Sequence, residues 1–245
     1  MATSAESSHR PETPSAVKPK PKKNLNFCGE PSFVTFIVGL EAQKFTVHKN
    51  LAEHYSPFFE KAFNSGFIEG KTQQMVLEDV EPEIFGYMVN WLYTQKIIHP
   101  EDKGIEPVEF AKLWVLAGRF MIPQLQNEAI QRIKPTTTLS LGNFQPCMTF
   151  VLNKQFEGTQ LYQAVLDDVL QLCLNIAGIT THFGPPRVSD LKDFVETVMN
   201  EGGDTTAAII KALILQCAPY RSNSGKVKKP IKDYFVEEGD VASGQ

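Results

Sequence analysis

The order of hydrophobic patterns over residues 33–133 is the feature that most constrains how this chain can fold. Apolar side chains alternate with their neighbours in residues 34–38, 45–47 and 75–77, and this period of two predicts three strands. A fourth, very short strand is predicted for Lys96–His99. Because the strands are few and short, they predict a small sheet that helices must cover.

Helical patterns fill the spaces between and after these strands. Proline suits the first position of a helix, and it marks helices that begin near Pro57, Pro82 and Pro107, with Ser56 as N-cap of the first. The helix after Pro107 is apolar nearly all round, so we expect it to be buried. The order of elements predicts an α+β fold, a small mixed sheet capped by helices. Two further helices are predicted, Lys49–Tyr55 and Leu125–Ile133.

The residues that follow Pro135 predict a helical C-terminal region. Residues 147–152 fit either a strand or a helical turn. Residues 161–176 carry two apolar stripes side by side, which predicts a helix covered on two sides, by the first domain or by a partner. Further helices are predicted over residues 190–199 and 205–217.

Both ends of the chain are rich in Ser, Pro, Lys and Glu and poor in large apolar side chains, which predicts disorder. The predicted organisation is a disordered tail at 1–29, a domain at 30–134, a helical extension at 135–219 and a second disordered tail at 220–245. Each tail has a small basic cluster, which fits either plain solubility or a nuclear-import signal. These clusters are Lys18, Lys20, Lys22 and Lys23, and Lys226, Lys228, Lys229 and Lys232.

Composition and charge exclude several classes of function. A net charge of −4 argues against nucleic acid as the main partner, because phosphate binding needs a clustered positive surface. No apolar run approaches the roughly 20 residues of a membrane helix, and the N-terminus lacks the apolar stretch of a secretory signal. The four cysteines have no metal-ligand spacing, so we expect reduced thiols, no metal and an intracellular protein, cytoplasmic or nuclear or both.

We expect no enzymatic activity and no cofactor. The nearest catalytic pattern, Gly66–Thr72, has three residues between its glycines where a P-loop has four, and it follows a helix rather than a strand. His48 lies where the second strand meets a helix, and a backbone carbonyl is its expected partner in preference to a role as a base. An NTPase or hydrolase would depend on that incomplete P-loop alone.

Several blocks of residues in this order resemble the BTB/POZ domain, and the sequences of these blocks are similar to those of the fungal-type BTB group. The resemblance covers about a hundred residues and implies the BTB/POZ fold. Its blocks are Phe45–Lys49, Ser56–Phe59, Phe63–Gly70, Leu77–Val80, Phe85–Thr94 and Leu116–Asn127.

The resemblance implies a non-catalytic protein–protein interaction adaptor. It implies a homodimer, or pairing with other BTB proteins, with a cullin as a candidate partner and a cargo that the sequence does not identify. The implied dimer interface is Phe33, Val34, His48, Leu51 and Tyr55. The implied partner-binding face is Phe58, Phe59, Phe63, Tyr87, Trp91 and Tyr93.

Two places differ from the family pattern. Many BTB domains carry Asp at the start of the first strand and Arg just before the motif serine, where this chain has Phe33 and Tyr55. Cullin-binding members often carry a glutamate near the turn that here reads Thr94–Ile98, without one. Two hypotheses therefore remain open: a substrate adaptor of a cullin–RING ubiquitin ligase, and a scaffold in transcriptional or signalling assemblies with no ligase role.

Overall fold

The computed structural model describes residues 25–99, 101, 103–133, 141–176, 196, 203–217 and 231–236. The N-terminal basic cluster, most of the C-terminal one, and the predicted helix over 190–199 apart from Glu196 lie outside these residues.

A three-stranded mixed sheet forms the first layer, as predicted. Strands β1 (Phe33–Val38), β2 (Gln43–His48) and β3 (Gln74–Leu77) lie in the order β2-β1-β3. The β1–β2 pair is antiparallel and the β1–β3 pair is parallel. Alternate side chains of β1 are fully buried at Val34 and Phe36, which places the core on one face of the sheet.

The predicted fourth strand at Lys96–His99 is wrong, because this stretch is a bend followed by irregular backbone. Its backbone groups bond to side chains instead of to a neighbouring strand. The Lys96 N–H donates to the Thr94 hydroxyl at 3.2 Å, and the Ile97 N–H donates to the Glu128 carboxylate at 3.4 Å. Because side-chain oxygens accept hydrogen bonds from these backbone N–H groups, the groups do not need a neighbouring strand as acceptor.

Six helices complete this part of the chain, and four of them begin at a proline. They are α1 (Lys49–Tyr55), α2 (Pro57–Phe63), α3 (Ile68–Thr72), α4 (Pro82–Thr94), α5 (Pro107–Arg119) and α6 (Pro123–Arg132). Ser56 caps α2 as predicted, since its hydroxyl oxygen accepts from the Phe59 N–H at 3.0 Å. The same hydroxyl donates to the Phe120 carbonyl at 2.6 Å, which ties the start of α2 to the end of α5.

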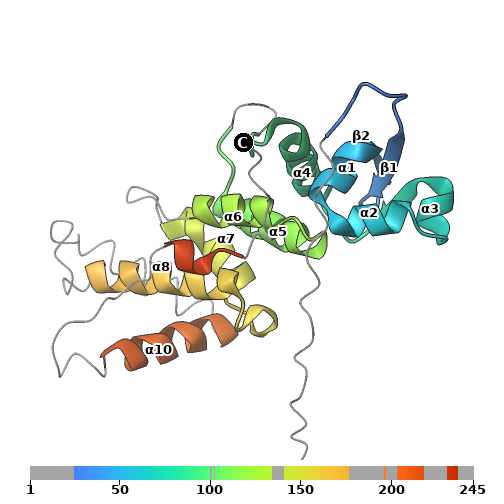
Figure 1. Ribbon diagram of the computed structural model, residues 1–245. Coiled ribbons are helices and arrows are strands. Elements are labelled where there is room, and N and C mark those ends of the chain that lie inside the picture. Colours follow the sequence, from blue (N-terminus) through green and yellow to red (C-terminus); the bar gives the residue numbers. More distant parts are fainter. Residues whose placement is uncertain are drawn as a thin grey trace, which may run out of the picture.

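The core beneath the sheet is rich in phenylalanine. The Phe36 ring lies 5.1 Å from Phe59, 5.7 Å from Phe63 and 5.0 Å from Phe85, measured between ring centroids. The α5 helix is buried as predicted, with α4, α6 and α7 (Leu141–Val151) packed against it. In Figure 1, α5 and α6 lie between the sheet with its helices and the C-terminal helices.

The helical extension continues with η1 (Lys154–Phe156), α8 (Gln160–Ile176) and α10 (Gly203–Cys217). Residues 147–151 belong to α7, so the helical alternative is correct there. Both stripes of α8 are mostly buried where they are described, for example at Val165 and Leu170, while Leu166 is half-buried. Helices α7 and α10 and the short helix η3 (Ile231–Tyr234) contact α8. Of the described helices, none is long and apolar enough to cross a membrane.

Two parts of the predicted disordered tails are packed against the core. Tyr234 is only 3% exposed, and Phe235 and Val236 lie against the buried side chains. Leu25, at the other end of the described chain, also packs on the core. The composition of these segments is lysine-rich on average, and it hid a few apolar residues that the core buries.

Candidate protein-interaction surfaces

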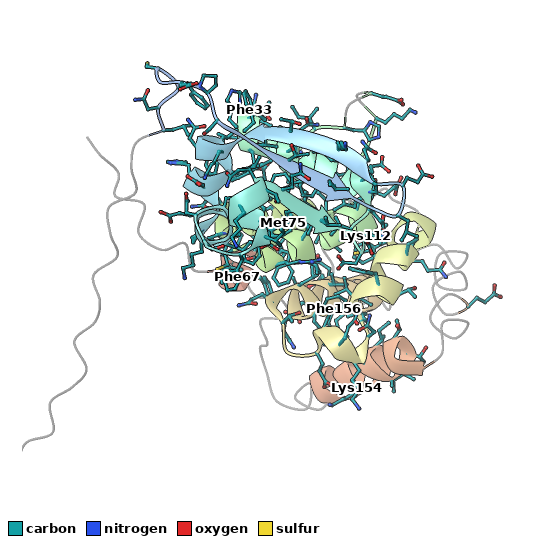
Figure 2. All side chains as sticks on the ribbon, turned by 90° about the vertical axis from the view of Figure 1, so that its right-hand side faces the viewer. Phe33, Phe67, Met75, Lys112, Lys154 and Phe156 are labelled. Atoms are coloured by element: carbon teal, nitrogen blue, oxygen red, sulfur yellow. The ribbon has the colours of Figure 1, made fainter. Side chains whose placement is uncertain are left out.

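The strand ends place Phe33 and His48 together, as the implied dimer interface requires. The two residues are opposite each other in the β1–β2 register, and their ring centroids are 4.6 Å apart. Phe33 is 45% exposed, and it projects at the end of the molecule opposite Lys154 (Figure 2). Tyr55 is half-buried at the end of α1, where burial raises its pKa. These three side chains are accessible to a second copy.

Val34 and Leu51 do not form part of that accessible surface. Val34 is fully buried and Leu51 is 3% exposed, because both point into the core of this chain. They can support an interface only by holding β1 and α1 in place.

His48 is held by a tyrosine hydroxyl instead of the expected backbone carbonyl. The Tyr93 hydroxyl accepts from the His48 backbone N–H at 3.1 Å, and it lies 2.9 Å from Nδ1 of the same residue. A hydroxyl can accept from one group and donate to another, so one phenol bonds to both the backbone and the side chain of His48. Tyr93, which the resemblance assigns to the partner-binding face, thus lies beside His48 of the implied dimer interface.

Phe27 also contacts His48, with ring centroids 5.4 Å apart. Phe27 is 53% exposed and Tyr93 is 47% exposed, so four aromatic rings form one accessible area that we call the Phe33 surface. It consists of Phe27, Phe33, His48 and Tyr93. A pocket of about 210 Å³ adjoins it, lined by Phe27, His48 and Asn50 among others. Sequence reasoning missed Phe27 because its surroundings resemble a disordered tail.

Only Phe58 and Tyr93 of the implied partner-binding face are accessible. Phe59 and Phe63 pack on Phe36 under the sheet, and Tyr87 and Trp91 are at most 2% exposed. The four buried residues are therefore core residues of this chain. Phe58 is half-buried against Phe120, with ring centroids 5.6 Å apart, so part of its ring remains available.

The hydroxyl of Tyr87 joins α4 to α5. It lies 3.0 Å from Glu109 Oε1 and 3.2 Å from Glu83 Oε1. Burial raises the pKa of Tyr87, and the two carboxylates raise it further because they favour the protonated phenol. His99 lies 3.6 Å from the Glu83 carboxylate. These contacts hold helices together and bring no nucleophile to an accessible cavity.

A glutamate does lie at the Thr94–Ile98 turn, although the turn itself contains none. Glu128 of α6 accepts from the Trp91 indole at 2.8 Å and from the Ile97 N–H at 3.4 Å. The Arg132 guanidinium lies 3.3 Å from the same carboxylate. Glu128 thus fixes the turn whose Ile98 is 40% exposed. The available signal was that Glu128 is the one acidic residue in the sequence of α6.

The segment that resembles a P-loop has a different geometry. Ile68–Thr72 forms the short helix α3, and the Thr72 hydroxyl donates to the Ile68 carbonyl at 2.8 Å. A P-loop threonine instead binds the magnesium ion of a nucleotide. Within the part of the chain that the structure describes, no three His, Cys, Asp or Glu side chains gather as a metal site would require.

Comparison with known proteins agrees with this fold. The sequence profile of the BTB/POZ domain matches residues 24–135, from just before Leu25 to just after α6. Residues 24–135 therefore form a BTB/POZ domain, and the architecture is the α+β BTB fold followed by helices.

Relatives of the chain match over lengths close to that of this domain. Kelch-like protein 40 of Xenopus tropicalis is 26% identical over 109 residues, which is 44% of this chain and 17% of the relative. Kelch repeat and BTB domain-containing protein 8 of Rattus norvegicus is 30% identical over 104 residues, 41% of this chain and 17% of the relative. A BTB/POZ domain-containing protein of Arabidopsis thaliana is 30% identical over 105 residues, 43% of this chain and 13% of the relative. The chain spans less than a fifth of the length of each.

Proposed function

We propose that this protein is an intracellular adaptor, in the cytoplasm or the nucleus, that acts through a dimerising BTB/POZ domain. The observation that carries the proposal is the Phe33 surface, an exposed aromatic area at the strand ends of a BTB/POZ domain. The similarity of the sequence blocks to the fungal-type BTB group supports placing the chain in that group. Within the matched residues 24–135 we propose a BTB/POZ domain at 30–134, followed by an extension at 135–219; the outer segments 1–29 and 220–245 are proposed as tails apart from Leu25 and residues 231–236, which pack on the core.

The chemistry of the Phe33 surface favours a second copy of the chain as its partner. Aromatic side chains supply large apolar area at low conformational cost, and they dominate the binding energy of protein interfaces. Phe33 and Tyr55 stand where many BTB domains carry an Asp and an Arg. The interface therefore depends on apolar contact in place of an ion pair, and it should be insensitive to salt.

The proposal is tested by replacing Phe33 with lysine and measuring mass by light scattering over a range of concentrations. In a symmetric dimer the two lysines would face the partner's aromatic surface, and loss of a central aromatic anchor typically costs about 2–4 kcal/mol, so the dissociation constant should rise by roughly 30- to 1000-fold. The matched control is Phe67→Lys, because Phe67 is 75% exposed directly before α3 and is not part of the Phe33 surface. A wild-type protein that stays monomeric at micromolar concentration contradicts the proposal.

The finer proposal is that the protein is a substrate adaptor for a cullin–RING ubiquitin ligase. It is supported by the partly exposed ring of Phe58 and by the exposed Ile98 of the turn to which Glu128 is hydrogen-bonded. Binding of a purified cullin N-terminal domain should weaken at least tenfold on Ile98→Glu. It should be unchanged on Leu40→Glu, a 93% exposed residue in the β1–β2 turn.

Absence of cullin binding in the dimeric wild-type protein would exclude the ligase role and leave the alternative, a scaffold in transcriptional or signalling assemblies. The light-scattering and cullin-binding results are independent, so failure of one does not decide the other.

A further inference from the structure

The segment Ile231–Val236 lies on the helical extension although it is far along the chain from most of the residues it contacts. Figure 1 shows its short helix η3, in red, beside α8. Four of its side chains pack against the buried core, and Tyr234 is the most deeply placed at 3% exposed. The other three are Ile231, Phe235 and Val236.

The hydrogen bonds of this segment resemble those of a bound peptide, because they involve both its backbone and a side chain. The Asn127 side chain of α6 donates to the Val236 carbonyl at 3.1 Å and accepts from the Val236 N–H at 2.8 Å. One buried amide thus satisfies both backbone groups of one residue, as a neighbouring strand would. The Tyr234 hydroxyl donates to the Asp167 carboxylate of α8.

We propose that α6 and α8 together form a binding site for a short segment with an aliphatic residue, then Tyr-Phe-Val three positions later, and that residues 231–236 are its ligand in cis. Backbone hydrogen bonds give such a site affinity, and pockets for individual side chains give it specificity. Asn127 binds the backbone of the segment at Val236. Asp167 accepts a hydrogen bond from the Tyr234 hydroxyl, so the site favours tyrosine over phenylalanine at that position. The same segment supplied by another molecule fits the same contacts.

The covalent link between ligand and site determines how strongly an outside peptide can compete. Residues 218–230 join α10 to the segment, and a connection of such length gives an effective concentration on the order of 1 mM. A segment with an intrinsic dissociation constant of about 100 µM would then occupy roughly nine-tenths of the sites in cis. An added peptide would bind the wild-type chain about tenfold more weakly than a chain whose own segment cannot dock.

The test is a titration of a fluorescent peptide of residues 229–240 with full-length proteins, followed by anisotropy. In the Tyr234→Ala, Phe235→Ala double variant the cis ligand is disabled, and the peptide should bind about tenfold tighter than it binds to wild type. Adding Asn127→Ala to this double variant should abolish binding. Adding the matched control Asn64→Ala, at the end of α2, should leave binding unchanged, because the Asn64 side chain bonds to Glu53 and Glu60 and not to the segment.

Hydrogen exchange on the wild-type chain keeps the proposal testable if a variant fails to fold. Amides of residues 231–236 should exchange slowly in the wild-type chain, and excess unlabelled peptide should accelerate them without changing the protection of α5. Exchange at the rate of a free peptide in the wild-type chain overturns the proposal. So does equal peptide affinity for wild type and a folded double variant.

Discussion

Ser56 is the residue at which a small substitution should have the largest structural effect. It is fully buried, its oxygen caps α2 through the Phe59 N–H at 3.0 Å, and its proton satisfies the Phe120 carbonyl at 2.6 Å. In Ser56→Ala the cap is lost at a cost of about 1 kcal/mol, and a buried carbonyl without a donor costs about 1–3 kcal/mol more. The expected loss is therefore about 2–4 kcal/mol, a large part of the roughly 5–15 kcal/mol that stabilises a typical domain.

Urea unfolding followed by circular dichroism measures this loss. With a slope of about 2 kcal/mol per molar urea, the midpoint should fall by roughly 1–2 M at unchanged slope. Ser65→Ala is the matched control: this hydroxyl also bonds two backbone groups, Ala62 O and Phe67 N, but it is half-buried and water can replace it. A midpoint shift no larger for Ser56→Ala than for Ser65→Ala would refute the argument that burial of both hydrogen bonds makes Ser56 important.

Two further predictions concern the Thr94–Ile98 turn and the buried thiol. Glu128→Ala leaves the Trp91 indole and the Ile97 N–H without their acceptor, so the free energy of unfolding should fall by about 2–4 kcal/mol. The exposed Glu157→Ala should leave it unchanged. Equal urea midpoints for the two variants would contradict this prediction. Burial raises the pKa of the Cys147 thiol to about 12, so an alkylating reagent followed by peptide mass mapping should modify the exposed Cys28 quickly and Cys147 only on unfolding. Rapid labelling of Cys147 at pH 7 would contradict its burial. Because the folded state keeps the Cys147 proton while the unfolded thiol loses it near pH 9, the free energy of unfolding should decline as pH rises above about 9.

The sheet and most helices follow from local sequence signals. The period of two in β1 and β2, and the prolines that open four helices, are properties of a few consecutive residues, and the structure keeps them. The fourth strand failed for a non-local reason. Thr94 and Glu128 satisfy the backbone at Lys96 and Ile97, and the sequence gives no sign that α6 reaches this turn.

The candidate surfaces were predicted only at the level of elements. A family resemblance identifies which helix or strand faces a partner, but it does not say which side chains on that element point outward. Phe58 and Phe59 were therefore both predicted to face a partner. In the structure Phe58 is half-buried and Phe59 is fully buried. Phe27 and the docked Tyr234 were missed because their burial or contact depends on residues far away along the chain.

The two ends of the molecule should act independently. The Phe33 surface lies at the ends of β1 and β2, whereas the segment Ile231–Val236 packs on α8 among the C-terminal helices (Figure 1). Sites that share no contacts and are far apart show additive free energies, because a change at one does not alter the partners of the other. A dimer formed through Phe33 would therefore keep residues 231–236 docked on α6 and α8 in both copies. Accordingly, Phe33→Lys should change the mass without changing hydrogen exchange at residues 231–236, and coupled changes would show that the dimer includes the helical extension.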